Sequence, residues 1–259
     1  MRSGGPASED EDGTGDSLAG FLDRIAGPRK RVTVFGPAPY RDLEPLLARF
    51  DVELVHESLS VPESKGYLTV SEGERYLGSV PAAAFGELVD PARAAPWDAD
   101  TRNSAFRDLT ALLAGTEFSA TDRRHLLATS REFEDRASRV GRGALHVGFQ
   151  SLPAFRAQLP IYGRLGDETD LDVTVYGDGD WESPEGVDVA VRTESGGELG
   201  EFWVLAFDGG GDPEMACALL AEATGPNASG EYRGAWTYDF ETVRALVDYL
   251  DDTYGERNP

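Results

Sequence analysis

Two apolar segments separated by a short glycine-rich loop restrict the possible folds of this chain most strongly. Residues 202–207 read FWVLAF and residues 215–223 read MACALLAEA, with Asp208-Gly-Gly-Gly-Asp212 between them. A Walker loop needs Lys and then Ser or Thr after its last glycine, and carboxylates at the loop edges would repel a phosphate. We therefore exclude a phosphate-binding loop here. Because glycine and aspartate tolerate positive φ, the pattern predicts a hairpin turn between two strands.

Two alternatives for this loop stay open. Asp208, Asp212 and Glu214 are close enough in sequence to offer oxygen ligands to a hard cation, although three consecutive glycines supply only backbone carbonyls. Residues 212–225 could also form a helix, with Asp212 as N-cap and Gly225 as its end. We favour the strand, because a similar hairpin is predicted in the first half of the chain.

Helix and strand patterns follow one another twice in the same order. Val32-Thr-Val-Phe-Gly36 matches Val173-Thr-Val-Tyr-Gly177, and each follows a helix that begins Ser-Leu. We predict an α+β fold of two diverged α-β-β-hairpin-α repeats with mixed or antiparallel sheets. The first repeat would hold helices at 17–27, 40–50 and 82–90, strands at 31–39 and 51–59, and a hairpin at 66–81. The second would hold helices at 151–166 and 240–255, strands at 171–181, 186–194 and 232–239, and a hairpin at 201–223.

A long amphipathic helix is predicted between the repeats, over residues 121–141. Its apolar positions fall on one face, and the stretch 121–143 carries six arginines in an otherwise acidic chain. These arginines could dock an anion or an acidic partner, or they could be satisfied by acids one turn away in surface ion pairs such as Glu132 with Arg136. The residues that we expect to bind a partner are Arg136, Arg139 and Arg142.

The acidic composition excludes several classes of partner. The chain has 47 acidic and 24 basic residues and a formal net charge of -23, and only Lys30 and Lys65 are lysines. Such a surface stays hydrated where concentrated salt shortens the screening length, so we interpret it as an adaptation to a salt-rich cytoplasm. No basic stripe lies outside residues 123–142, and we therefore expect no direct binding to nucleic acid.

The number of cysteines and the hydropathy of the sequence limit where in the cell the protein can work and which covalent or metal sites it can form. Cys217 is the only cysteine, which excludes an internal disulfide and a multi-cysteine zinc site, and its apolar neighbours predict a buried, unreactive thiol. No apolar run is long enough to span a membrane or to serve as a signal peptide. We expect a cytoplasmic protein with a disordered acidic tail at 1–16, a first repeat at 17–120, and the linking helix and second repeat at 121–259.

Catalytic motifs are missing from the sequence. His56, His125 and His146 have no metal-ligand spacing, and no Gly-x-Ser-x-Gly nucleophile elbow occurs. A metal-dependent hydrolase would need Asp208 and Asp212 to converge with a histidine. We therefore predict that the chain is not an enzyme and holds no metal.

Aromatic residues of the second half lie next to predicted strand ends, where binding pockets commonly open. Trp181, Trp236 and Tyr238, with the carboxylates of Asp239 and Asp208, would suit a small planar or cationic ligand. The same aromatic rings could instead fill the core of a small sheet. The sequence names neither a ligand nor a cofactor.

Four stretches carry a combination of motifs that is more specific than any one of them. They are SREFEDRASRVGRGALHVGFQ (130–150), DVTVYGDGDW (172–181), FWVLAFDGGGDPEMACALLAEA (202–223) and YRGAWTYDFETVRALVDYL (232–250). Together they resemble the DICT family, sensory domains found with diguanylate cyclases and two-component proteins, and the likeness to haloarchaeal members extends back to about Ser17.

The resemblance implies a sensory role, often near light-responsive or nucleotide-signalling modules, with no fixed ligand. No kinase, cyclase or DNA-binding segment accompanies these stretches, so we expect the signal to pass to a separate output protein. The alternatives are an interaction module without a ligand and, less favoured, the metal-dependent hydrolase.

Folding should depend on salt, because the excess of acidic over basic residues leaves repulsion that screening relieves. In dilute buffer at neutral pH we expect the near-UV circular dichroism of the folded chain to be lost, and molar KCl to restore it. A chain that keeps its full signal in low salt would contradict the salt-rich interpretation.

Overall fold

The computed structural model describes residues 17–37, 47–60, 62, 66–82, 104–120, 123–178, 189–194, 197–224 and 231–255. These residues form two sheets and six α-helices, consistent with the predicted α+β class. The tail at 1–16, most of the helices predicted at 40–50 and 82–90, and Trp181 lie outside the described residues. None of the described helices is long and apolar enough to cross a membrane.

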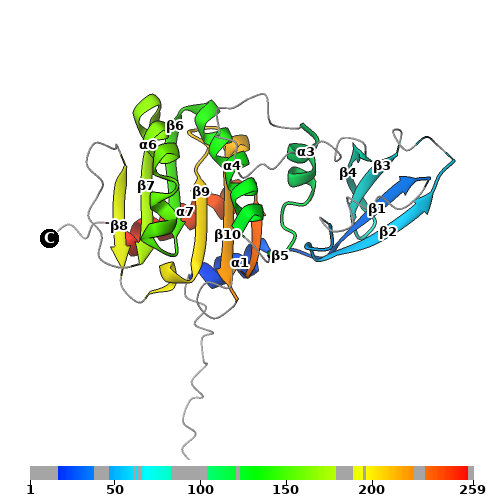
Figure 1. Cartoon of the computed structure of the whole chain (residues 1–259), viewed down its shortest axis with the longest axis horizontal. Coiled ribbons are helices and arrows are strands. Elements are labelled where there is room, and N and C mark those ends of the chain that lie inside the picture. Colours follow the sequence, from blue (N-terminus) through cyan, green and yellow to red (C-terminus); the bar gives the residue numbers. More distant parts are fainter. Residues whose placement is uncertain are drawn as a thin grey trace, which may run out of the picture.

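The larger sheet has seven strands in the order β5-β11-β10-β9-β6-β7-β8 (Figure 1). β6, β7 and β8 are parallel to one another, whereas every other neighbouring pair is antiparallel. The strands are β5 (Phe118–Ala120), β6 (Arg142–Phe149), β7 (Asp170–Asp178), β8 (Ala190–Glu194), β9 (Phe202–Phe207), β10 (Cys217–Ala223) and β11 (Tyr232–Thr237).

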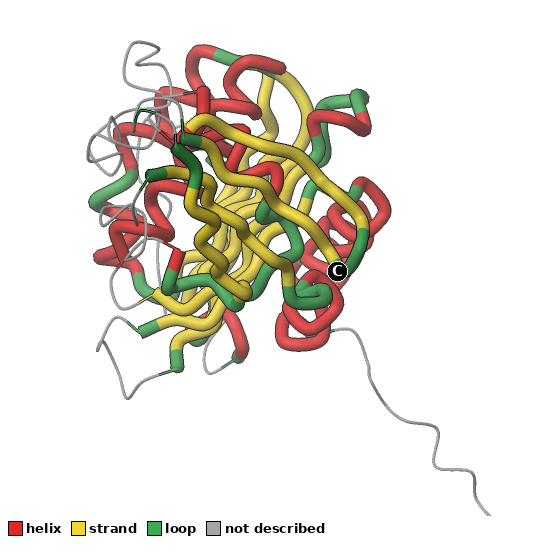
Figure 2. The backbone as a smooth tube through the Cα atoms, turned by 90° about the vertical axis from the view of Figure 1, so that its right-hand side faces the viewer, coloured by secondary structure: helices red, strands yellow, loops and turns green. Residues whose placement is uncertain are grey.

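Helices cover both faces of this sheet (Figure 2). All six side chains of β9 are buried, and they alternate between two apolar layers, since Trp203 and Leu205 join one layer and Val204 and Ala206 the other. A strand without a polar face is typical of a sheet enclosed by two helical layers. One layer contains α4 (Arg123–Val140), α5 (Leu152–Arg156) and α6 (Leu159–Glu168), and the other contains α1 (Leu18–Ile25) and α7 (Phe240–Tyr254).

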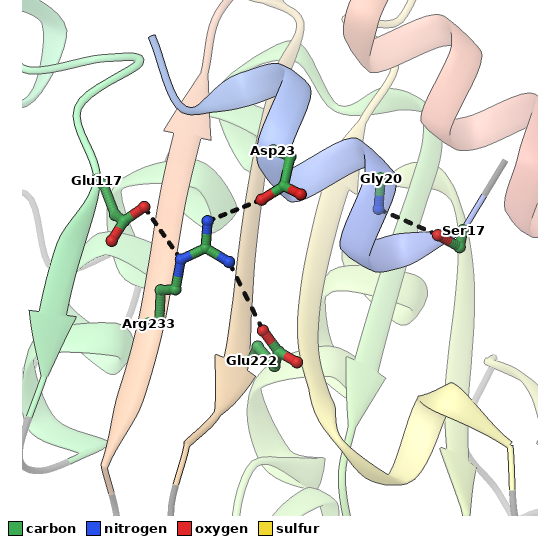
Figure 3. A network of polar contacts seen from close by, with 6 residues as sticks. All are labelled: Ser17, Gly20, Asp23, Glu117, Glu222 and Arg233. Atoms are coloured by element: carbon green, nitrogen blue, oxygen red, sulfur yellow. Dashed lines mark hydrogen bonds and ion pairs between the residues drawn. The ribbon is translucent and has the colours of Figure 1, made fainter. Parts of the chain in front are cut away.

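The N-terminal helix α1 is fixed to the larger sheet by apolar packing and by an arginine of β11. Ser17 Oγ accepts a hydrogen bond from the Gly20 amide and caps the helix, whose buried side chains face the sheet. The Arg233 guanidinium contacts Asp23 of α1 at 2.7 Å, Glu117 at 3.0 Å and Glu222 of β10 at 3.9 Å (Figure 3). Arg233 therefore joins α1, β10 and the residues before β5.

The smaller sheet has four strands in the order β2-β1-β3-β4. β1 is parallel to β2 and antiparallel to β3, and β3 and β4 form the hairpin that the alternating pattern predicts. One face is buried through Val32, Leu68, Val70 and Val80. The strands are β1 (Lys30–Gly36), β2 (Val52–Ser58), β3 (Tyr67–Glu72) and β4 (Arg75–Pro81).

Helix α3 (Ser104–Leu112) and the residues after it join the two sheets (Figure 1). Leu112 packs on Gly78 of β4, and buried Lys30 of β1 donates to the carbonyls of Leu112 and Ala114. From the larger sheet, Trp236 Nε1 donates to the Thr110 carbonyl at 2.8 Å. The Trp236 ring also contacts the rings of Phe50 and Phe118, with centroids 5.7 and 5.6 Å away. We call these contacts the junction; they make one continuous apolar core of the two sheets.

The glycine loop is the hairpin turn that the sequence predicts. β9 and β10 pair antiparallel on either side of it, so residues 217–223 form a strand and the helical alternative is wrong. Gly209, Gly210 and Gly211 all have positive φ, at 87°, 60° and 93°. Three consecutive left-handed residues explain the run of glycines, because side chains rarely adopt this conformation.

The structure does not confirm the predicted duplication. β1 pairs directly with β3, but β6 lies between β7 and β9, so the two hairpins belong to differently connected sheets. Helix α1 packs on the larger sheet and not beside β1, and β5 also joins the larger sheet. The matching Val-Thr-Val segments share only a short parallel pairing with the strand that follows each of them.

Replacing Trp236 with Ala should lower the free energy of unfolding by about 3–5 kcal/mol, because it empties the centre of the junction. Trp236→Phe keeps a ring but leaves the Thr110 carbonyl without its donor, and we expect a loss of about 1–2 kcal/mol. Urea unfolding at fixed KCl concentration measures both changes. Equal losses in the two variants would show that the hydrogen bond, rather than the packing, holds the junction.

Candidate functional site

The middle of helix α4 is buried on all sides although most of its residues are charged. Residues 130–135, Ser-Arg-Glu-Phe-Glu-Asp, are each at most 8% exposed. The helix lies between the larger sheet, Tyr162 and Gln158 of the α5–α6 region, and Arg107 of α3. Buried charges cost free energy unless they are paired. Side chains of α4 with protein partners are therefore structural, and those without partners are candidates for binding a ligand.

One side of α4 is held by hydrogen bonds. Arg131 donates to Glu134 and Gln158, and the Tyr162 hydroxyl donates to the other oxygen of Glu134. Trp203 Nε1 of β9 donates to Ser130 Oγ at 3.2 Å. Burial raises the pKa of Tyr162, so its hydroxyl keeps its proton and remains a donor. These contacts attach α4 to the α5–α6 region and to the sheet.

The other side of α4 holds polar atoms that find no hydrogen-bond partner among the described residues. They are Oε2 of Glu132, Nε of Arg107 and Nε of Arg136, all buried. Arg107 Nε is 3.7 Å from Glu132 Oε2, which is close enough for charge attraction but too long for a hydrogen bond. Desolvation raises the pKa of Glu132 to about 7, and the neighbouring Arg107 opposes this rise.

Tyr238 completes this group, which we call the Glu132 cluster: Arg107, Glu132, Arg136 and Tyr238. The Arg136 guanidinium lies over the Tyr238 ring, 4.6 Å from its centroid, and the Phe133 ring packs edge-on against the same ring. Burial raises the pKa of Tyr238 and that of the neighbouring Cys217 thiol. Cys217 is therefore the buried, protonated thiol that the sequence predicts.

The glycine loop is attached to the same helix by two arginines. Arg136 Nη1 donates to the Glu214 carbonyl at 2.9 Å, and Arg142 Nε donates to the Gly210 carbonyl at 2.9 Å. The loop carboxylates cap the turn, since Asp208 Oδ1 accepts from the Gly210 amide and Asp212 Oδ1 from the Glu214 amide. In the described part of the chain, no group of three or more His, Cys, Asp or Glu residues is arranged to hold a metal ion.

The structure brings together some of the predicted site residues and separates others. Arg136 and Tyr238 are in the Glu132 cluster, and Arg142 and Asp208 lie beside them at the glycine loop, whereas Arg139 pairs with Asp135. Trp236 lies in the junction and is 2% exposed, which favours its role in the core. Asp239 caps α7 by accepting from the amide and hydroxyl of Thr242, and these bonds lower its pKa. Trp181 lies outside the described residues.

Sequence reasoning missed Glu132 and Arg107 as candidate site residues. The pattern assigns Glu132 to a surface ion pair with Arg136, one turn away. In the structure its side chain is 3% exposed, and its charge partner is Arg107 of α3, 3.7 Å away. One pattern in the sequence could have indicated this burial. The central turns of the helix carry charged residues on every face, whereas a surface helix keeps one face apolar.

Comparisons with known proteins find a similarity to a sensory family in the middle of the chain. Residues 104–224 match the DICT family, described as a sensory domain in diguanylate cyclases and two-component systems. No curated protein matches the chain. The crystal structure of polyphosphate kinase from Porphyromonas gingivalis is similar with a TM-score of 0.35 and 12% identity, over 90% of this chain and 47% of the kinase chain. That resemblance is too weak to bear on fold or activity.

Replacing Gly210 with Val should destabilise the protein, because φ is +60° there and the added Cβ would meet the Arg142 carbonyl at 2.3 Å. We expect a loss of at least about 2 kcal/mol in the free energy of unfolding. Asp208→Asn keeps the oxygen that caps the turn, so its change should stay within about 0.5 kcal/mol. Thermal unfolding at fixed KCl concentration compares the two, and a large loss in Asp208→Asn would show that the carboxylate charge is needed at this loop.

Proposed function

We propose that this chain, whose residues 104–224 belong to the DICT family of sensory domains, senses a signal inside the cell by binding a small ligand and passes it to a separate output protein. The acidic, lysine-poor composition supports a cytoplasmic location. The single observation that carries the ligand-binding part is the Glu132 cluster, which lies almost entirely within the matched residues.

A ligand would use the groups of the cluster that protein partners leave unpaired. Buried polar atoms normally find a hydrogen-bond partner, and three such atoms in one cluster favour an additional occupant. The Tyr238 ring and the glycine-loop backbone adjoin the cluster through Arg136. A change in Arg136 on binding would therefore reach the loop directly, and Arg142 and Asp208 would respond through the same loop.

The alternative is an interaction module that needs no ligand, and one observation favours it. Among the residues that the structure describes, the large hydrophobic side chains that are exposed are Leu54, Tyr67 and Tyr76, at 40%, 39% and 62%. All three belong to the smaller sheet, which precedes the matched residues 104–224. Exposed apolar groups on the adjacent strands β3 and β4, Tyr67 and Tyr76, suit a partner protein. In the sensory proposal this sheet is where the output protein would bind.

Neither form of the proposal includes catalysis. The three histidines belong to different elements: His56 lies on β2 of the smaller sheet, His125 on helix α4 and His146 on β6 of the larger sheet. Burial lowers the pKa of His146, whose Nδ1 is 2.8 Å from the Tyr176 hydroxyl. His146 is thus a buried neutral side chain next to α7, on the opposite face of the sheet from α4.

Mass spectrometry of the purified chain under native and unfolding conditions tests the proposal. We expect a bound mass, or an added absorbance, that is present in the folded chain and lost on unfolding. Arg136→Gln should reduce the bound fraction several-fold, whereas Arg244→Gln, which removes one exposed arginine from α7, should not. If the native and unfolded masses agree, the chain does not retain a ligand and the interaction module is favoured.

That alternative has its own measurement. Tyr67→Ser and Tyr76→Ser remove exposed rings from the smaller sheet without touching the Glu132 cluster. A loss of binding to the output protein in these variants, with full binding in Arg136→Gln, would assign recognition to the sheet alone.

A further inference from the structure

The three unpaired atoms of the Glu132 cluster define the chemistry of their occupant. Nε of Arg107 and Nε of Arg136 are hydrogen-bond donors, and Oε2 of Glu132 is an acceptor; all three are buried without a partner among the described residues. The occupant must therefore accept hydrogen bonds from two guanidinium groups and donate one to a carboxylate.

The distance within the cluster suits a single hydroxyl-type oxygen between two of these atoms. Arg107 Nε and Glu132 Oε2 are 3.7 Å apart. One oxygen can lie about 2.9 Å from both, accepting from the arginine while donating its own proton to the glutamate. A second oxygen of the same molecule would then be available to Arg136.

The local charge favours an anion at this place, in contrast to the rest of the chain. The formal net charge of the protein is -23, which repels anions in general. Around Glu132, however, Arg107, Arg136 and Arg139 face two acids, and Arg139 is paired with Asp135. Glu132 thus pairs with Arg107 alone, while Arg136 adds positive charge nearby, and the remaining positive charge can be matched by an oxyanion.

We propose that Arg107, Arg136 and Glu132 form a binding site for an oxyanion that retains a proton, of which hydrogen phosphate is the simplest. The P–OH oxygen accepts from Arg107 and donates its proton to Glu132, and an anionic oxygen accepts from Arg136. This inference rests on the proposed ligand-binding function and names the class of ligand.

The carboxylate makes the site selective by protonation state. An ionised glutamate accepts a hydrogen bond from hydrogen phosphate, but it repels sulfate, which has the same charge near pH 8 and no proton to donate. A phosphate monoester also lacks a proton at that pH, because its second pKa is about 6. Comparing phosphate with a monoester thus separates the free anion from an esterified phosphate as the source of the ligand.

Isothermal titration of the full chain at pH 8 and fixed KCl concentration, with inorganic phosphate, sulfate and methyl phosphate as probes, tests the site. We expect phosphate to bind at least about tenfold more tightly than sulfate or methyl phosphate. In Glu132→Gln the amide can donate to any of the three anions, so the ratio of phosphate to sulfate affinity should fall to about one.

Arginine variants test the same site in case the Glu132→Gln variant does not fold. Arg107 is 38% exposed and Arg107→Gln should fold, but it should weaken phosphate binding at least about fivefold. Arg244→Gln, on the exposed face of α7, should leave phosphate binding unchanged. Near-UV circular dichroism confirms that each variant is folded before titration.

Two results would overturn the inference. Equal affinity of the wild-type chain for phosphate and sulfate would show attraction by charge without recognition of the proton. No binding of phosphate would show that the cluster does not take up this oxyanion. In either case a bound mass that still depends on Arg136 would leave the sensory proposal standing, with a ligand of another class.

Discussion

Burial of both faces of the seven-stranded sheet limits where charged side chains can pack against it. β9 contributes six buried side chains to two apolar layers and offers no polar face. Charged groups near the centre of the sheet therefore come from the covering helices, and α4 has buried neighbours even on the side that faces away from the sheet. Because desolvated charges require partners, the centre of α4 becomes the most constrained part of the structure.

The two sides of α4 meet that requirement differently. Arg131 and Glu134 are held by Gln158 and Tyr162, so hydrogen bonds within the protein offset most of their desolvation, and only Nε of Arg131 has no partner among the described residues. Glu132 has only a distant arginine partner and a pKa raised to about 7. A carboxylate in this condition gains free energy from any donor that reaches it, which is why the oxyanion proposal rests on this side of the helix.

Helix α3 places the cluster and the junction on one short segment. Arg107 faces Glu132, Thr110 accepts from Trp236, and Leu112 and Ala114 accept from Lys30 of the smaller sheet. A ligand that moves Arg107 would thus act on an element that both sheets hold. This contiguity is a spatial route from the Glu132 cluster to the exposed side chains of the smaller sheet; the energetic coupling along it is a separate quantity, measured by double-mutant cycles.

Local patterns determined the helix over residues 123–140, the hairpin at Asp208–Asp212 and all strands except β5 and β6, which were not predicted, because alternation, helical spacing and positive-φ glycines act between residues close in sequence. The similarity of residues 104–224 to the DICT family could also be recognised from the sequence. Tertiary structure alone decided that β6 lies between β7 and β9, an arrangement that the predicted duplication does not allow. It also decided that Trp236 fills the junction. It also decided that Glu132, expected in a surface ion pair with Arg136, is buried beside Arg107 of α3, since a periodic pattern shows which face is apolar but not what covers the charged one.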